Sequence, residues 1–414
     1  MRILLLNQFY VPDVAATGQL LADLAAELAA LGHEVHVVCS RRAYGGGTLP
    51  GPACPSRSGV KVHRLPASGF GRAGLTGRLA DYLSFYVLAA ARVLSLRRMD
   101  VCVALTTPPL AGLIGAALKR WRGTRLVLWT MDLYPQVAVA YGTVRRGGAV
   151  HRLLGALAAR LCAAADGIIC PGETMRSALV AAGADGGKVL AADNWVPGEV
   201  VQPMSAALSA FRGRRCRSGG PIVMYCGNLG LGHDLDVVIR AWAALGAAAP
   251  GELVFVGEGS MLAALKSLAR ELGLRSTSFH PPVPLARLSD CLAAGDIHLV
   301  SQRQGAEGLI VPSKLYGVLA AGRPVIFMGP RGSEAARIVA SSGAGLIVPP
   351  GDATALADAI RTLSADAELR AEMGRRGEGF YHANLGRRRS LHRIVSVVLG
   401  LHPTPPQPEE SPSP

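Results

Sequence analysis

Residues 307–326 combine residue types that suit the binding of a phosphorylated ligand. Glu307 offers a carboxylate, and Pro312, Ser313 and Lys314 predict the start of a helix that a later glycine and proline end. Ser313 is expected to accept hydrogen bonds from the unpaired amides of the first turn. A helix N-terminus attracts anions, and Lys314 adds a full positive charge. The segment therefore predicts a diphosphate site at this helix start.

Lysine is rare in this chain. Of the 43 basic residues, 38 are arginine and five are lysine. Because lysine is so rare here, we expect a lysine at a helix start to have a specific role rather than to be an ordinary surface residue. The alternative is an ordinary capped helix with a solvated lysine.

Two glycine-rich turns also follow predicted strands. Gly227 and Asn228 come after an apolar run at 222–226, and Glu258 lies in a Gly-Glu-Gly turn after 253–256. Glycines let backbone amides approach a ligand, although tight turns also need glycine for steric reasons alone. The spacing is not that of a dinucleotide-binding turn, and no Walker A motif occurs. Ligands of open α/β sheets gather beyond the carboxyl ends of the strands, so we expect these residues to converge with Glu307 and Lys314.

The first half of the chain supplies two candidates that would face the same cleft. Gly18 lies at the start of a helix, and Asp132 follows the apolar run 126–129. Asp132 is the best titratable candidate in this half. An aspartate in this place is also often a helix cap or a turn former, and that alternative stays open.

Apolar runs alternate with helical patterns from end to end, which predicts parallel sheets built from βαβ units. The runs expected to be strands are 2–6, 35–39, 60–65, 101–105, 126–129, 167–170, 222–226, 253–256, 278–280, 297–301, 324–327 and 345–348. The second half thus repeats the architecture of the first, and the sequence predicts an α/β protein.

A chain of 414 residues exceeds what one core usually organises. Residues 198–220 lack periodicity, so we place the domain boundary there. The predicted domains are 1–200, completed by a returning helix at about 385–400, and 220–384. A glycine-rich loop at 45–59 and a disordered, proline-rich tail at 402–414 are also expected.

The net charge of +14 predicts an anionic partner. The basic residues are dispersed and no nucleic-acid-binding motif accompanies them, so nucleic acid is not expected. The cysteines form no CxxC pair, which is typical of reduced thiols in a cytoplasmic protein. The spacing of His33 and His36 does not suit zinc, and no metal site is expected.

Residues 75–98 predict an apolar helix that is edged with arginines and carries Tyr82, Phe85 and Tyr86. Such a helix could lie in a bilayer interface. Equally, it could be partly buried and pack on the sheet. No apolar run is long enough to span a membrane.

Several of these segments together resemble glycosyltransferase family 4, especially its bacterial surface-polysaccharide branch of colanic-acid and O-antigen fucosamine-type transferases. The resemblance covers roughly residues 1–400. The segments that carry it are 8–19, 129–135, 225–230, 256–259, 311–317 and 320–324.

The resemblance implies a GT-B architecture, in which two Rossmann-like domains with parallel sheets face a central cleft. It implies that a sugar is transferred from a nucleotide diphosphate donor with retention of configuration, without a cofactor or a required metal. The expected donor is a UDP-sugar. Gly18 would approach the donor phosphate, Asn228 and Lys314 would contact the diphosphate, and Glu307 would bind sugar hydroxyls. The implied donor-binding set is completed by Gly227, Glu258, Ser313 and Leu315. The catalytic candidates are Asp132, Glu307 and Lys314.

The chain departs from the family pattern in two places. Many members carry a second glutamate, whose place falls here on Gly317. Many members also have an arginine and a lysine shortly after the strand that ends at Gly227, and this turn lacks both. Lys314 would have to supply much of that charge, together with His233.

The expected function is transfer of a sugar to a polyprenyl-diphosphate-linked glycan in surface polysaccharide biosynthesis. The enzyme would be cytoplasmic and peripheral on the inner face of the plasma membrane, since an anionic lipid acceptor would account for the basic surface. Two alternatives remain, a GT-B nucleotide-sugar epimerase and a catalytically silent partner that binds a nucleotide sugar.

Overall fold

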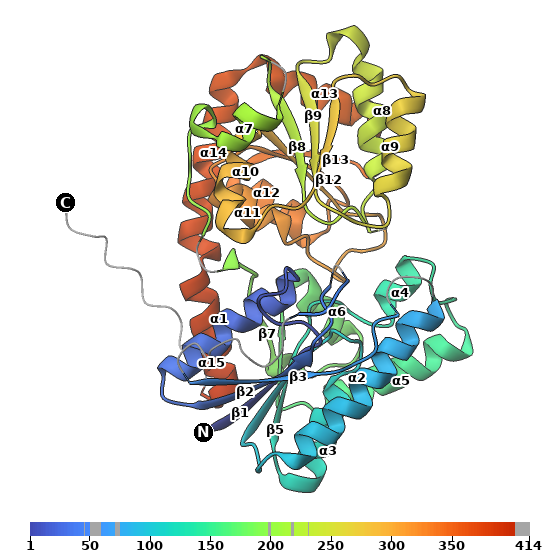
Figure 1. Cartoon of the computed structure of the whole chain (residues 1–414), viewed down its shortest axis with the longest axis vertical. Helices are drawn as coiled ribbons and strands as arrows, with labels where there is room; N and C mark the ends of the chain where they lie inside the picture. Colours follow the sequence, from blue (N-terminus) through green and yellow to red (C-terminus); the bar gives the residue numbers. More distant parts are fainter. Residues whose placement is uncertain are drawn as a thin grey trace, which may run out of the picture.

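The computed structural model of the chain describes residues 1–44, 46–49, 59–70, 75–197, 200–216, 219–230 and 232–401. It contains two α/β domains, with the carboxyl-terminal domain uppermost in Figure 1. The expected tail at 402–414 and most of the expected loop at 45–59 lie outside the described residues.

The first domain holds a parallel sheet of seven strands within the described residues, in the order β3-β2-β1-β4-β5-β6-β7. The strands are β1 (Arg2–Leu6), β2 (Glu34–Ser40), β3 (Val60–Leu65), β4 (Val101–Leu105), β5 (Arg125–Trp129), β6 (Gly167–Cys170) and β7 (Val189–Ala191). The first six were predicted to within a residue. Sequence reasoning missed β7, because three residues are too short to show a period.

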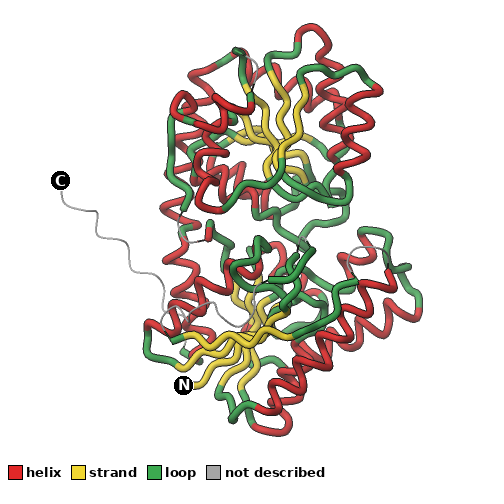
Figure 2. Tube along the Cα trace, in the orientation of Figure 1, coloured by secondary structure: helices red, strands yellow, loops and turns green. Residues whose placement is uncertain are grey.

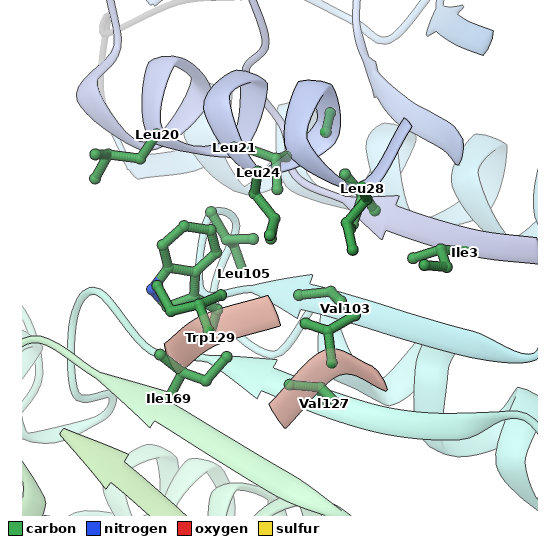
Figure 3. Close-up of a cluster of buried hydrophobic side chains, with 14 of the residues drawn as sticks. Ile3, Leu20, Leu21, Leu24, Leu28, Val103, Leu105, Val127, Trp129 and Ile169 are labelled. Atoms are coloured by element: carbon green, nitrogen blue, oxygen red, sulfur yellow. The ribbon is translucent and has the colours of Figure 1, made fainter. Parts of the chain in front are cut away.

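The central strands β1, β4, β5 and β6 are nearly continuous apolar runs because helices cover both faces of the sheet, whereas the edge strand β3 carries Lys61, His63 and Arg64. Every residue of β4 is buried. Leucines of α1 (Ala16–Ala30) recur at helical spacing and pack on one face of the sheet, as Figure 3 shows. The contacting residues labelled there are Leu20, Leu21, Leu24, Leu28, Ile3, Val103, Leu105, Val127, Trp129 and Ile169.

The other helices of this domain are α2 (Leu75–Ser95), α3 (Gly112–Arg122), α4 (Gln136–Ala140), α5 (Ala149–Ala164) and α6 (Glu173–Ala181). In Figure 1, α2, α3 and α5 run side by side along the lower right of the molecule, and α3 contacts both of the others.

The second domain repeats this plan with a six-stranded parallel sheet in the described residues, ordered β10-β9-β8-β11-β12-β13. The strands are β8 (Ile222–Cys226), β9 (Glu252–Val256), β10 (Thr277–His280), β11 (Ile297–Ser301), β12 (Val325–Met328) and β13 (Gly345–Val348). The helices are α7 (Ala210–Arg215), α8 (Leu235–Leu245), α9 (Leu262–Glu271), α10 (Leu288–Ala294), α11 (Lys314–Ala320), α12 (Glu334–Ser342), α13 (Ala353–Ala365) and α14 (Ala367–Phe380).

The end of the chain returns to the first domain. After α14, a π-helical turn (Tyr381–Leu385) leads into α15 (Arg387–Leu399), which runs down the left side of Figure 1. Leu391 and Ile394 join the core above the first sheet. Arg125 Nη1 donates to the carbonyls of Val397 at 2.7 Å and Val398 at 2.9 Å. A helix distant in sequence therefore completes the first domain.

Loops from both domains occupy the region where the domains meet, as Figure 2 shows. The Leu133 amide donates to the Leu309 carbonyl at 2.9 Å. The Thr174 amide, at the start of α6, donates to Glu334 Oε2 at 3.0 Å. Gly172 has φ +93°, and a Cβ there would lie 2.3 Å from the Glu334 carboxyl carbon. These contacts fix the arrangement of the domains at this seam.

Candidate active site

Lys314 is the first residue of α11, as predicted, and protein groups hold its ammonium. The Nζ atom lies 2.9 Å from His233 Nε2 and 5.1 Å from the centre of the Tyr225 ring. Burial lowers the pKa of Lys314 to about 8. The alternative of an ordinary solvated lysine is therefore wrong.

His233 orients the ammonium of Lys314 but adds no positive charge. Its Nδ1 lies 2.7 Å from the Ser301 carbonyl oxygen, which can only accept, so Nδ1 carries the ring proton. Nε2 is then free of a proton and accepts from Lys314. Burial, and after it the charge of Lys314, lowers the pKa of His233 to about 3. The expectation that His233 shares the charge of Lys314 is therefore wrong.

Gly227 lacks a side chain because Lys314 occupies that space. Gly227 has φ +142°, and a Cβ there would lie 2.3 Å from Lys314 Cε. Its amide donates to the Val256 carbonyl at 2.8 Å, and the Leu229 amide donates to the backbone carbonyl of Glu258 at 2.8 Å. The glycine was expected to bring backbone amides to a ligand, but the chain itself engages this amide and the space beside it.

One detail predicted for the start of α11 is wrong. Ser313 makes no capping hydrogen bond, because its φ of −61° and ψ of −19° are already helical and a capping residue needs an extended backbone. The side chain of Leu315 is fully buried in the domain core, so its role toward a donor stays a prediction that concerns its backbone. The positive charge at this helix start therefore comes from Lys314 rather than from a capped turn.

Gly317 occupies the place of the second family glutamate, and there is room for a side chain. The nearest atom to a Cβ at this position would be a methyl carbon of Leu292 at 3.4 Å, an ordinary contact. The absence of the carboxylate is therefore not required by packing.

The other candidates of the second domain lie at the predicted edge of its sheet with different surroundings. Asn228 and Glu258 have exposed side chains, and their turns pack on each other through backbone. Glu307 is half-buried and accepts a hydrogen bond from Gln304 Nε2 at 3.0 Å. The next residue, Gly308, packs against the Thr174 carbonyl of the first domain. Glu307 therefore sits at the seam between the domains.

Asp132 is a titratable group of the first domain near this seam. The amides of Met131 and Asp132 donate to Thr106 Oγ1 at 3.0 and 3.2 Å, which holds the turn after β5. Asp132 and Tyr134 line a small cavity of about 50 Å³. Burial raises the pKa of Asp132 to about 6. The carboxyl is thus a proton acceptor whose pKa lies near physiological pH.

Tyr141 connects Asp132 to the Lys314 pair across the seam. It follows α4, and a Cβ on Gly232 would lie 2.5 Å from its hydroxyl. Burial and the charge of Asp132 raise the pKa of Tyr141 to about 12, and the charge of Arg303 opposes them. Gly232 directly precedes His233, so Tyr141 of the first domain comes close to the segment that holds Lys314.

Gly18 packs inside the first domain. A Cβ there would lie 3.0 Å from the Phe9 carbonyl and from the Tyr10 Cα, so a side chain at this position would crowd the backbone of this segment. Its role toward a donor stays a prediction. Among the described residues, no three His, Cys, Asp or Glu side chains are grouped so that they could hold a metal ion.

Sequence reasoning missed Tyr225, Tyr141 and Glu334. Tyr225 packs under the Lys314 ammonium, Tyr141 touches the second domain, and Glu334 accepts from the first domain. None of them lies in a segment whose local pattern predicts such a contact.

Two family matches cover most of the chain. Residues 16–195 match the glycosyl transferase 4-like domain, and residues 220–366 match the glycosyl transferases group 1.

Two bacterial proteins of described function are similar to this chain. WbjE of Pseudomonas aeruginosa, described as a glycosyltransferase, is 27% identical over 286 residues, which cover 69% of this chain and 71% of WbjE. WcaI of Escherichia coli strain K12 is described as a colanic acid biosynthesis glycosyl transferase. It is 26% identical over 378 residues, which cover 87% of this chain and 91% of WcaI.

Solved structures share the whole architecture. Sucrose-phosphate synthase from Thermosynechococcus elongatus superposes with a TM-score of 0.77 at 18% identity, covering 97% of this chain and 98% of that one. HepE from Anabaena, solved with UDP and glucose, superposes with a TM-score of 0.71 at 17% identity. The match covers 97% of this chain and 100% of HepE.

Proposed function

This chain belongs to the glycosyltransferases of GT-B fold, with a glycosyl transferase 4-like domain followed by a group 1 domain, and we propose that it transfers a sugar from a UDP-sugar to a lipid-linked glycan. We further propose that the transfer retains the anomeric configuration and serves surface polysaccharide biosynthesis. The description of WcaI as a colanic acid biosynthesis enzyme supports the pathway class, and the HepE complexes with UDP support the donor class.

The observation that carries the proposal is the position of the Lys314 ammonium. His233 and Tyr225 hold it at the edge of the second sheet, and Gly232, which precedes His233, lies beside the hydroxyl of Tyr141 from the first domain. A cation fixed before the reaction stabilises the charge that develops on a diphosphate leaving group, with little reorganisation.

The proposed step uses groups on both sides of the seam. The bond between the donor sugar C1 and the diphosphate oxygen breaks, the departing UDP keeps the electron pair, and Lys314 pairs with it. A new bond joins C1 to the acceptor oxygen on the same face that the diphosphate leaves, which retains the anomeric configuration, and the proton of that hydroxyl passes to the Asp132 carboxylate. Glu307 accepts hydrogen bonds from hydroxyls of the donor sugar. The step calls on no cofactor or metal ion, because Lys314 supplies the positive charge.

A donor panel tests this function. We expect the purified chain to bind UDP in calorimetric titration and to release UDP from at least one UDP-sugar when bacterial glycolipid extract is added. Stronger binding of GDP or dTDP would overturn the UDP assignment. Conversion of the donor alone to an epimer, or UDP binding without turnover on any acceptor, would overturn the transfer reaction.

The outer face of α2 supports a place at a membrane surface. Leu79, Leu83 and Val87 recur every four residues and are 55%, 64% and 61% exposed. Trp121 on the neighbouring α3 is 70% exposed. Such a face, with arginines beside it, suits an anionic bilayer interface. None of the helices that the structure describes is both long and apolar enough to cross a membrane.

The aromatic residues of α2 do not take part in that face. Phe85 is fully buried, and Tyr86 donates a hydrogen bond to the Pro109 carbonyl. The side of α2 that carries Phe85 and Tyr86 packs on the domain, as one of the two sequence-based alternatives expected. The opposite side, with the leucines, is exposed, and only that side could meet a bilayer as the other alternative expected.

Vesicle flotation tests the membrane proposal. We expect the wild-type chain to float with vesicles that contain phosphatidylglycerol, and less with neutral vesicles or at high salt. Replacing Leu79, Leu83 and Val87 together by serine should reduce flotation at least about fivefold, because buried apolar area sets such binding. The matched control replaces the exposed Leu208 and Leu272 by serine. Equal flotation of the triple variant and the wild type would contradict the proposal.

A further inference from the structure

Tyrosines gather around Asp132 in the first domain. Tyr134 lines the same cavity as Asp132, and Tyr141 approaches from the seam. On the same helix as Tyr82, Tyr86 donates to the Pro109 carbonyl, and Thr106 of that loop accepts from the Asp132 amide, so α2 lies beside the turn that carries Asp132. Burial raises the pKa of Tyr82, and the charges of Arg78 and Asp132 also act on it. With nine tyrosines in the whole chain, three around one carboxyl is a concentration that packing alone does not require.

The hydroxyls of these tyrosines are not used by the fold. Tyr82, Tyr134 and Tyr141 are half-buried, and within the described part of the chain none of their hydroxyls has a hydrogen-bond partner. By contrast, Tyr86 on the same helix donates to the Pro109 carbonyl. Half-buried aromatic rings with available hydroxyls suit a sugar, which presents C–H groups to a ring face and hydroxyls to its edge.

Arg78 lies one helical turn before Tyr82 on α2. It is exposed, and among the residues that the structure describes it forms no ion pair. Leu79 and Leu83, next to Arg78 and Tyr82 in sequence, belong to the exposed apolar face. One turn of α2 therefore presents two exposed leucines, the guanidinium of Arg78 and the half-buried ring of Tyr82.

We propose that Arg78 and Tyr82 of α2, together with Tyr134 and Tyr141, form the acceptor site for a glycolipid whose diphosphate binds Arg78. The proposal rests on the proposed function. The lipid tail follows Leu79 and Leu83, the sugar packs on the tyrosine rings, and its reacting hydroxyl meets Asp132. Arginine binds phosphate oxygens through paired N–H donors.

The spacing also predicts how much of the glycan the site holds. Four residues separate Arg78 from Tyr82, a rise of about 6 Å. That length leaves room for at least one sugar between the diphosphate and the reacting hydroxyl. The proposed acceptor is therefore a lipid-linked saccharide rather than a bare lipid phosphate.

Calorimetric titration with two synthetic probes tests this site. We expect the wild type to bind farnesyl diphosphate-linked glucose at least about tenfold more tightly than farnesyl phosphate, because only the former carries a sugar and a diphosphate. Arg78→Ala and Tyr82→Ala should each weaken binding of the first probe at least about tenfold. Tyr82→Phe keeps the ring and should lose less.

Arg120→Ala is the matched control, because Arg120 is an exposed arginine of the adjacent α3 and its loss removes the same charge. UDP affinity, measured for every variant, reports on folding and on the donor site separately. Unchanged probe affinity in Arg78→Ala and Tyr82→Ala, or an equal loss in Arg120→Ala, would overturn the acceptor site. A wild-type chain that fails to bind UDP would instead overturn the proposed function.

Discussion

Lys314→Ala is expected to lower the rate of sugar transfer at least about tenfold, because it removes the cation that stabilises the departing diphosphate. Both kcat and UDP affinity should fall, since UDP carries the same charges as the leaving group. Steady-state release of UDP and calorimetric titration measure the two effects. Lys266→Ala is the matched control, because Lys266 is an exposed lysine of the same domain.

The pH dependence of UDP binding gives a second readout of Lys314. The pKa of about 8 means that the ammonium is charged below pH 8 and loses its proton above it. UDP affinity should therefore be level below pH 8 and should decline as the pH rises further. Full transfer activity in Lys314→Ala, or UDP affinity that does not change above pH 8, would remove Lys314 from the mechanism.

Asp132→Asn is expected to reduce transfer by about 10²–10⁴-fold, the range typical of a lost general base. Asparagine keeps the size of the side chain but cannot accept the proton. UDP affinity should be little changed, because Asp132 lies on the first domain and the proposed diphosphate contact is Lys314 of the second domain. Transfer by the wild type should also fall below about pH 6, where the carboxyl becomes protonated.

The same substitution should stabilise the fold. Burial raises the folded-state pKa of Asp132 to about 6, so the folded chain disfavours the charged form. The resulting loss of stability is present above pH 6 and fades as the pH falls toward the unfolded-state pKa. The melting temperature of Asp132→Asn should therefore exceed that of the wild type by more at pH 8 than at pH 5.

Asp166 provides the matched contrast. Burial alone would raise its pKa, but hydrogen bonds from Lys119 and the Leu126 amide lower it overall. Asp166→Asn should lower the melting temperature and retain transfer activity. A wild-type rate in Asp132→Asn, or a lower melting temperature for it at pH 8, would show that Asp132 is a structural residue.

Sequence patterns determined the scaffold of this protein. Apolar runs of three to six residues that alternate with helical periods predict parallel sheets with crossover helices on both faces, so both sheets were predicted nearly complete. The same patterns placed Lys314 at a helix start and Asp132 after a strand. Carboxyl ends of parallel strands share one edge, which is why residue type and position sufficed to place each group at that edge of its sheet.

Only the tertiary structure decided what surrounds these groups. The partner of Lys314 is His233, 81 residues away, and the space that Gly227 leaves is filled by the same lysine. The neutral state of His233 depends on burial and on the Ser301 carbonyl, and neither follows from local sequence. Likewise, the sequence of α2 showed its aromatic and apolar residues but not which side would face the sheet. Periodicity reports the repeat of one element, whereas charge state, partners and exposure depend on contacts between elements distant along the chain.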